Sequence, residues 1–344
     1  MRATLLYLLC TVCCASAALA GPCTGSEAQL AKISRQLTRN SLDGVRPALK
    51  ALSLAYPDCS QIVLQQARLA EAEGDPKAAA DLYYRYTDSD PNDSKGLAYF
   101  GRFFLEQRDY MRADALSAAA VDRNPQDPSV LSLRGQILVM KGQSSEGQDF
   151  LEKAVQLDAD DPEAQFALGV IYDKAKAAPK AVERFRAVVN LNPHDARAWD
   201  YLALNLEPLG DLDGADQAYR KGLEVNKAGR YHDSFLDYNY GRLLAKRGDV
   251  VASREHLDRA VELTPQIRAV WYERARLDIR MHNYEQARAD SEKAAACTET
   301  GGIIDLQIYS LLSQVYTRLG DKALAKKYID LTRETPPPVR GESR

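Results

Sequence analysis

Apolar residues recur every three or four positions through most of the chain, in short stretches that are separated by polar turns. This spacing places apolar side chains on one face of a helix. The stretches come in pairs, and each pair is joined by a short polar turn such as EGD (73–75), QRD (107–109), LGD (209–211), RGD (247–249) or LGD (319–321). The pattern therefore predicts a series of hairpins, each made of two amphipathic helices.

These hairpins repeat at a fixed interval. Two sets of residues lie 34 residues, or a multiple of 34, apart: Pro57, Pro91, Pro125 and Pro193, and Gly101, Gly135 and Gly169. A two-helix hairpin cannot bury both of its apolar faces alone, so repeated hairpins are expected to stack. We expect nine units, which start near residues 26, 60, 94, 128, 162, 196, 234, 268 and 306. The interval is longer at KAGRYHD (227–233) and at TETGG (298–302), where we expect longer loops.

The residues within each unit follow a common order. The unit that begins at Ser94 has large apolar, small and bulky residues at fixed slots, with Ser117 as the one departure: Leu97, Gly101, Phe104, Ala113, Ala120 and Pro125. This order resembles that of the tetratricopeptide repeat family. The resemblance implies an all-α, right-handed superhelical solenoid of about nine helical hairpins. It would occupy residues 21–334 and be followed by a disordered tail at 335–344.

Certain slots of the repeat carry structural expectations. Small residues let the two helices approach closely, so a bulky residue in place of Ala113 or Ala215 should overpack a hairpin. Trp199 and Trp271 stand in a slot that normally holds a large apolar residue. We therefore expect both indole rings in the core.

The N-terminal residues 1–20 have the layout of a secretory signal peptide, with Arg2, a short apolar run and small residues before an expected cleavage at Gly21. We expect export to a bacterial periplasm or, in a eukaryote, to the secretory lumen. A retained membrane anchor is the alternative, although the run is shorter than the ~20 residues that a spanning helix needs. A lipid anchor on Cys23 is disfavoured by Pro22. No membrane span is expected after cleavage.

Three cysteines remain once the signal peptide is removed, namely Cys23, Cys59 and Cys297. An oxidising compartment makes one disulfide reasonable. Cys23 and Cys59 each precede the first helix of neighbouring units, where helix starts lie close together in a stack. We therefore predict a Cys23–Cys59 disulfide and expect Cys297 to be a small buried apolar residue.

Composition and motifs argue against several function classes. The 45 basic and 48 acidic side chains give a net charge of −3, without the basic excess that nucleic acid binding requires. The four histidines lie in different units with no metal-like spacing, and the acidic stretches DSDPNDS (88–94) and DADDPE (158–163) fit helix caps better than calcium loops. No nucleotide-binding, hydrolase or zinc-protease motif occurs. We expect no enzyme activity, cofactor, metal or nucleic acid partner.

The resemblance implies that the first helices of the units line a concave groove. The slots expected to face it hold Arg68, Tyr99, Arg102, Phe166, Tyr201, Tyr238, Asn239, Arg242, Tyr272, Glu273 and Arg276. Tyrosine beside arginine suits the recognition of extended peptides or acidic segments. The alternative is an ordinary solvated helix face. Of the pattern with which some family members clamp a terminal carboxylate, only Asn239 is present, so that activity is not expected.

The function that these features favour is an exported, non-enzymatic scaffold or adaptor that binds a protein or peptide partner. By analogy with the family, it would serve an envelope assembly, secretion or polymer-export system. A soluble periplasmic or lumenal chaperone accessory with many client chains is the alternative. Such an accessory would suppress the aggregation of unfolded proteins, whereas a scaffold would ignore them. An enzyme would need a site that no motif reveals.

Overall fold

A computed structural model of the chain describes residues 23–38, 41–226, 233 and 235–336. Every regular element in these ranges is helical, and the 18 α-helices form nine consecutive pairs along the chain. The two helices pack directly on each other in the pairs from α3–α4 to α17–α18, whereas α1 and α2 each pack on α3. The predicted all-α fold of about nine hairpins is thus confirmed. The expected signal peptide (1–20), residues 337–344 of the expected tail and most of the KAGRYHD loop lie outside the described residues.

The chain divides into two compact units, Met1–Gln126 and Asp127–Arg344. The first unit contains α1 (Glu27–Thr38), α2 (Val45–Ala55), α3 (Ser60–Ala72), α4 (Pro76–Ser89), α5 (Ser94–Glu106) and α6 (Tyr110–Arg123). The second begins with α7 (Pro128–Met140), α8 (Ser144–Leu157), α9 (Pro162–Lys174), α10 (Ala178–Leu191), α11 (Ala196–Leu206), the short 3-10 helix η1 (Glu207–Leu209) and α12 (Leu212–Val225). It continues with α13 (Leu236–Arg247), α14 (Val250–Leu263), α15 (Arg268–Arg280), α16 (Tyr284–Ala296), α17 (Asp305–Leu319) and α18 (Lys322–Glu334).

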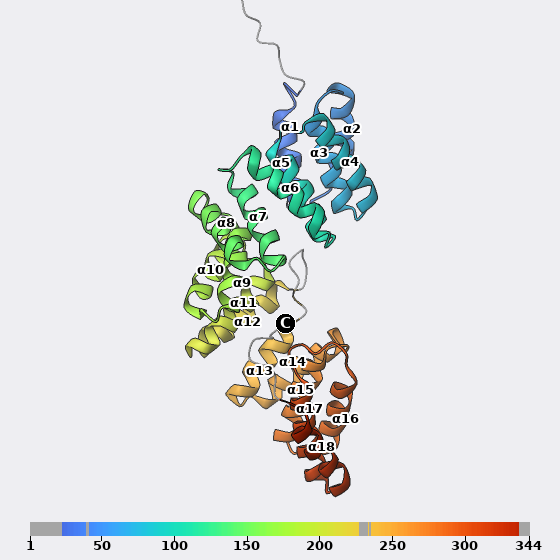
Figure 1. The fold of residues 1–344 in the computed structure, drawn as a ribbon, viewed down its shortest axis with the longest axis vertical. Helices are drawn as coiled ribbons and strands as arrows, with labels where there is room; N and C mark the ends of the chain where they lie inside the picture. The colour runs from blue at the N-terminus through green and yellow to red at the C-terminus, as the bar shows by residue number, and fades with distance from the viewer. Residues whose placement is uncertain (1–22, 39–40, 227–232, 234, 337–344) are drawn as a thin grey trace, which may run out of the picture. The chain divides into compact units, whose positions relative to one another are not determined.

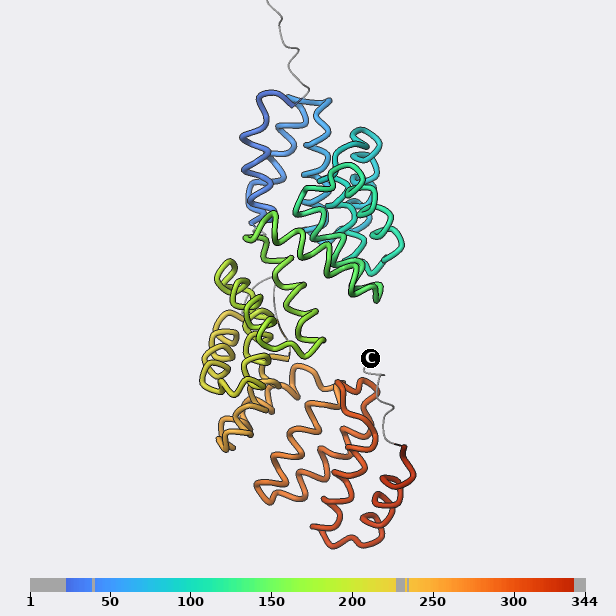
Figure 2. The backbone as a smooth tube through the Cα atoms, turned by 60° about the vertical axis from the view of Figure 1, so that its left-hand side comes forward, coloured from blue at the N-terminus to red at the C-terminus, as the bar shows by residue number. Residues whose placement is uncertain are grey.

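Within each unit the hairpins stack in chain order (Figures 1 and 2). In the second unit, each second helix packs against the first helix of the next hairpin, and successive first helices also pack against one another. Successive second helices are not among the packed pairs of described helices. The hairpins are therefore closer together on the side formed by α7, α9, α11, α13, α15 and α17, which we call the first-helix face.

Small residues sit where the two helices of a hairpin meet. A Cβ atom on Gly135 of α7 would lie 2.5 Å from Cγ of Leu151, and one on Gly147 of α8 would lie 2.7 Å from the Gly135 carbonyl oxygen. Ala113 and Ala215 take the same role in their hairpins, and both are fully buried. Any larger side chain at these positions has to push the helices apart.

The two acidic stretches cap the starts of α5 and α9. Asp93, in the DSDPNDS stretch, accepts a hydrogen bond from the backbone N–H of Lys95 at the start of α5. Asp161, in DADDPE, accepts from the N–H groups of Glu163 and Ala164 at the start of α9. These carboxylates satisfy backbone donors that the first turn of a helix leaves unpaired. The prediction that both stretches hold helix caps is confirmed.

The two tryptophans differ in burial. Trp271 is buried in a cluster of apolar side chains from α14 to α18, as predicted. Trp199 is only half-buried at the edge of its cluster. Each indole N–H donates to a proline carbonyl six residues earlier, Trp199 to Pro193 at 2.9 Å and Trp271 to Pro265 at 2.7 Å. The ring therefore fixes the loop that precedes its own helix, and this contact does not require full burial.

A disulfide bond joins the first hairpin to the second. The Sγ atoms of Cys23 and Cys59 are bonded in the structure; the Cα atoms of the two cysteines are 4.8 Å apart, and their sequence separation is 36. Cys59 is buried against α1 to α3, in a cluster that includes Ile33, Leu49 and Ile62. The link adds a covalent tie at the end of the stack, where the terminal hairpin has a neighbour on one side only.

We predict that the α16 substitution Ala287→Leu destabilises the second unit. Ala287 is 0 % exposed, so the added carbons must displace packed neighbours, at a cost of about 1–3 kcal/mol in the free energy of unfolding. Ala295→Leu on the exposed side of the same helix is the matched control and should cost under about 0.5 kcal/mol. Urea unfolding followed by circular dichroism measures both. Equal effects would contradict the close-approach explanation.

The disulfide can be tested by thiol labelling of the chain that begins at Gly21. One cysteine, Cys297, should react before reduction and all three should react after it. Replacing Cys23 and Cys59 with serine should lower stability by about 4 kcal/mol in the loop-entropy model, because the crosslink restricts the unfolded chain. Three labels without reductant would disprove the bond in the exported protein.

Candidate partner-binding site

Two tyrosine–arginine pairs lie on the first-helix face of the second unit. In α13 the Arg242 guanidinium lies 5.7 Å from the centre of the Tyr238 ring, and in α15 Arg276 lies 5.7 Å from the centre of the Tyr272 ring. In each pair the residues are four apart, so one helical turn places the cation beside the ring. The predicted repetition of this arrangement on successive first helices is present.

The α13 pair is the less accessible of the two. Tyr238 is half-buried against the apolar cluster that contains Trp271. Burial, reinforced by the Glu273 carboxylate, raises the pKa of the Tyr238 hydroxyl to about 12. Arg242 is half-buried as well. This pair is therefore neutral tyrosine beside charged arginine across the physiological pH range, and part of its surface is already used for packing.

Asn239 differs from the expectation that it faces the groove. It is 6 % exposed, and its side-chain amide donates to both carboxylate oxygens of Asp200 in α11, at 2.8 and 3.1 Å. Burial and the nearby Asp233 carboxyl raise the pKa of Asp200 well above its usual range, although Asn239 and Arg242 oppose this shift. Asn239 thus ties α13 to α11 and is buried between them rather than open to a partner.

Tyr201 also belongs to the packing rather than to an open surface. Its ring stacks on Phe185 at 5.1 Å between centroids and meets Phe166 edge-on at 5.5 Å. Burial raises the pKa of the Tyr201 hydroxyl. Phe166 in turn is covered by the Arg197 guanidinium at 4.7 Å. These three rings therefore contact one another, and part of the surface of Tyr201 is already used for packing.

In the first unit, one of the predicted arginines is bound to other side chains of the protein and the other is not. Arg68 covers the ring of Tyr99 at 4.3 Å and donates to the side chains of Ser34 and Gln65 at 2.8 and 2.9 Å. Its guanidinium is therefore committed to α1 and α3. Arg102, half-buried on α5, makes no hydrogen bond or ion pair within the described part of the chain.

A cleft opens between α15 and α17 on the first-helix face. Its volume is about 560 Å³. It is lined by residues of α15, α17 and α18: Tyr272, Arg276, Ile279, Arg280, Leu306, Gln307, Ser310, Leu311, Gln314 and Thr332. Tyr272 and Arg276 were predicted from the sequence, and the structure adds a second arginine, two amides and an apolar floor. This combination of a flat ring, cationic donors and apolar surface is suited to peptide recognition.

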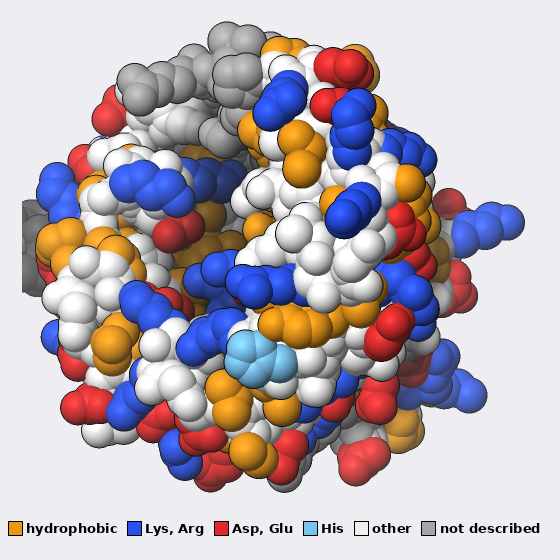
Figure 3. All heavy atoms as spheres, turned by 90° about the horizontal axis from the view of Figure 1, so that it is seen from below, with side chains coloured by type: hydrophobic (Ala, Val, Ile, Leu, Met, Phe, Trp, Pro, Cys, Tyr) orange, Lys and Arg blue, Asp and Glu red, His pale blue; other side chains and the backbone are white. Residues whose placement is uncertain are grey.

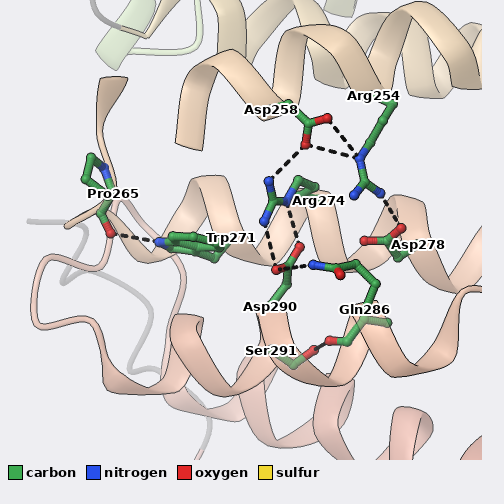
Figure 4. A network of polar contacts seen from close by, with 10 residues as sticks. Arg254, Asp258, Pro265, Trp271, Arg274, Asp278, Gln286, Asp290 and Ser291 are labelled. Carbon is green, nitrogen blue, oxygen red and sulfur yellow. Dashed lines mark hydrogen bonds and ion pairs between the residues drawn. The ribbon is translucent and has the colours of Figure 1, made fainter. Parts of the chain in front are cut away.

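A compact network of charged side chains connects α15 to α14 and α16 (Figure 4). Arg274 bonds the Asp290 carboxylate of α16 at 2.7 and 2.9 Å and reaches Asp258 of α14 at 2.9 Å. Arg254 of α14 pairs with Asp258 and with Asp278. Burial would lower the pKa of Arg274, but the two carboxylates outweigh it and raise that pKa. The network fixes α15 against both neighbouring helices and so fixes the residues on its opposite side.

Cys297 corrects a further expectation. It is half-buried at the end of α16 rather than enclosed in the core. The neighbouring side chain that is enclosed is Arg268, whose guanidinium donates to the carbonyls of Ala294, Cys297 and Ile303 and pairs with Asp305 at 2.6 Å. This arginine ties together the two ends of the longer TETGG loop, and Cys297 packs at the edge of the apolar cluster that contains Trp271.

Sequence reasoning missed Arg280 and the α17 amides of the cleft. Arg280 follows Arg276 by four residues, so the helical spacing alone could have placed both on one face. Gln307 and Gln314 are seven apart and share a face for the same reason. Their position opposite the arginines depends on how α17 packs on α15, and the longer TETGG loop obscures that register in the sequence.

Other classes of site are not seen in the described residues. None of the described helices is long and apolar enough to cross a membrane. No group of three or more histidine, cysteine or acidic side chains in these ranges is arranged to hold a metal ion. Lys and Arg side chains are interspersed with Asp and Glu on the face seen in Figure 3. The α15–α17 cleft is the best-defined candidate that remains.

Comparison with known families agrees with the helical repeat. Models of the tetratricopeptide repeat match residues 30–94, 100–162, 138–204, 202–267 and 306–331, which together span more than half of the chain. The chain belongs to the tetratricopeptide repeat family. The resemblance inferred from the slot pattern is confirmed.

Individual relatives are distant. The chain is 19 % identical over 257 residues to anaphase-promoting complex subunit 3 of Schizosaccharomyces pombe, an alignment that covers 75 % of this chain and 37 % of that protein. It is similar in fold to the APC/C hetero-tetramer Cut9–Hcn1, with a TM-score of 0.62 and 15 % identity over 90 % of this chain and 61 % of that one. It is also similar to the type IV pilus biogenesis factor PilW, with a TM-score of 0.54 and 19 % identity over 62 % and 95 %. The chain spans about half the length of the curated relatives it matches.

We predict that Arg274→Met destabilises the second unit by about 3–5 kcal/mol, because it leaves the fully buried Asp290 carboxylate without its arginine. Adding Asp290→Leu removes the unpaired charge and should restore most of the loss. Urea unfolding of the two single variants and the double variant gives the coupling free energy. A double variant as unstable as the sum of the singles would contradict a buried ion pair at this place.

Proposed function

We propose that this protein is an exported, non-enzymatic scaffold that holds an extended segment of a protein partner along the first-helix face of its second unit. The observation that carries the proposal is the Tyr272–Arg276 pair in the α15–α17 cleft. The pair offers an aromatic ring and charged hydrogen-bond donors. Both residues lie on α15, which the Arg274 network fixes against α14 and α16. A preorganised surface loses little conformational freedom when it binds.

Several features support binding rather than chemistry. The cleft is lined by arginine, amide, hydroxyl and apolar groups, and it contains no histidine, cysteine or carboxylate that could act as a nucleophile or general base. The signal-like residues 1–20 favour a role outside the cytoplasm. A relative in fold is described as a type IV pilus biogenesis factor, which is compatible with a role in an envelope assembly, secretion or export system.

A specific scaffold is favoured over a chaperone accessory with many clients. Promiscuous binding surfaces are broad, flexible and apolar. Here the candidate surface is one discrete cleft with two arginines on a single helix. Such a site selects a ligand by charge as well as by apolar contact.

Affinity capture from the native compartment tests this function. The double variant Tyr272→Ala with Arg276→Ala should bind the partner at least about tenfold more weakly, which corresponds to roughly 1.4 kcal/mol of binding free energy. Its helix content by circular dichroism should remain that of the parent. The matched control is Tyr284→Ala with Arg288→Ala, which removes the same residue types at the same spacing from α16.

Two results would count against the proposal. Partner capture that survives loss of Tyr272 and Arg276 would place the binding surface elsewhere. Suppression of the aggregation of unrelated unfolded proteins, removed by the same double variant, would favour the chaperone accessory instead.

A further inference from the structure

We propose that the α15–α17 cleft binds a carboxylate on an acidic peptide, and that Glu273 occupies Arg276 as an internal competitor until the peptide displaces it. The inference rests on the proposed function and specifies the ligand chemistry and the regulation of that same site. It follows from the charge of the cleft, the state of its two arginines and the pairing of Glu273.

The charge of the cleft selects an anion. Arg276 and Arg280 both line it, and no acidic side chain does. They are four residues apart on α15, so their guanidinium groups lie on the same side of the helix, one turn apart. A guanidinium matches a carboxylate with paired parallel N–H donors, which makes an acidic group the preferred ligand.

Arg280 is held ready for such a ligand. One of its terminal nitrogens donates to the Ala245 carbonyl at the end of α13, at 2.7 Å. This bond holds the long side chain in one position across the first-helix face. Because an arginine has five N–H donors and a single one is used here, the remaining donors can face the cleft.

Arg276 already carries a carboxylate. The Nη1 atom lies 3.0 and 3.1 Å from the two oxygens of Glu273, one turn earlier on the same helix. The Glu273 side chain is 14 % exposed, whereas that of Arg276 is 54 % exposed. A pair with so exposed an arginine is screened by solvent and contributes little to stability, so an incoming carboxylate can replace Glu273.

The other residues that line the cleft indicate which groups should lie next to the carboxylate on the ligand. Ile279, Leu306 and the buried Leu311 form apolar surface within the cleft. The Gln307 Oε1 atom accepts from the N–H of Ile304 at 3.0 Å, which leaves its amide N–H groups as donors toward the cleft. The ligand that fits is a short extended peptide with a carboxylate next to an apolar side chain and a backbone carbonyl.

Fluorescence anisotropy with labelled peptides tests this chemistry on the full exported chain. The probes are a peptide of alternating Asp and Leu, its Asn–Leu and Lys–Leu counterparts, and the Asp–Leu and Asn–Leu peptides with an amidated C-terminus. We expect the Asp–Leu peptide to bind about tenfold more tightly than the Asn–Leu peptide, with a preference that weakens as salt is raised. Equal binding of the amidated Asp–Leu peptide assigns the carboxylate to a side chain, and binding that needs the free C-terminus assigns it to the chain end. Either source agrees with the proposal.

Three variants test the roles of individual residues. Arg276→Gln and Arg280→Gln should each weaken the Asp–Leu peptide about tenfold and leave the Asn–Leu peptide nearly unchanged. Glu273→Gln should strengthen the Asp–Leu peptide by roughly threefold, because it removes the competitor of an exposed pair. Arg288→Gln on α16 changes the net charge by the same amount away from the cleft and should have no effect. A purely structural role for Glu273 would give weaker binding in Glu273→Gln, the opposite sign.

The results also separate this inference from the proposed function. Peptides that bind equally well without an Asp side chain and with an amidated C-terminus, and lose binding in the Tyr272→Ala variant, would overturn the carboxylate assignment and leave the scaffold function in place. Absence of binding by every peptide, together with partner capture insensitive to Tyr272 and Arg276, would overturn both. A dimer in light scattering that dissociates in Arg276→Gln would show that a second copy fills the cleft, which also overturns the proposal.

Discussion

The whole structure depends on how closely the two helices of each hairpin approach one another. At Gly135 and Gly147 the backbones lie so near that a single added carbon would overlap the facing helix. A hairpin this thin cannot bury both of its apolar faces alone, so the hairpins have to stack. Interiors of this density do not deform gradually. The positions of α15 and α17, and hence the cleft between them, follow from the same requirement.

The sequence predicted the fold well because each hairpin repeats the same physical solution. The first helices α3, α5, α7, α9 and α11 begin 34 residues apart, at the interval shown by the repeated prolines and glycines. Features outside the repeat were harder to predict. The boundary between the two compact units, after Gln126, is not indicated by any change in the order of residues within the repeat. Cys297 was expected to be buried as a small apolar residue in the last turn of its helix, but it is half-buried at the start of a long loop whose ends are held by Arg268, a residue of an earlier helix.

The candidate site was predictable only in part, for a related reason. Helical spacing within one unit correctly paired Tyr272 with Arg276, since both residues lie on the same helix. Asn239 could not be assigned in this way, because its fate depends on Asp200, which is 39 residues away and on another hairpin. The cleft likewise needs residues from two hairpins separated by a loop of unusual length. The position of a residue within the repeat predicts which face of its helix it occupies. Whether that residue is accessible to a partner depends on contacts with neighbouring repeats, which the position does not reveal.

The charged network between α14, α15 and α16 limits how this chain can evolve. Repeat proteins usually change length by duplication or loss of whole units, because interchangeable apolar faces allow any hairpin to follow any other. Here Arg274 and Asp290 are complementary to particular residues next to them, and Asp258 belongs to the preceding hairpin. Deleting or inserting a hairpin at this point would leave charges buried without partners. We therefore expect a change in repeat number to be tolerated less well between α13 and α16 than in the rest of the array.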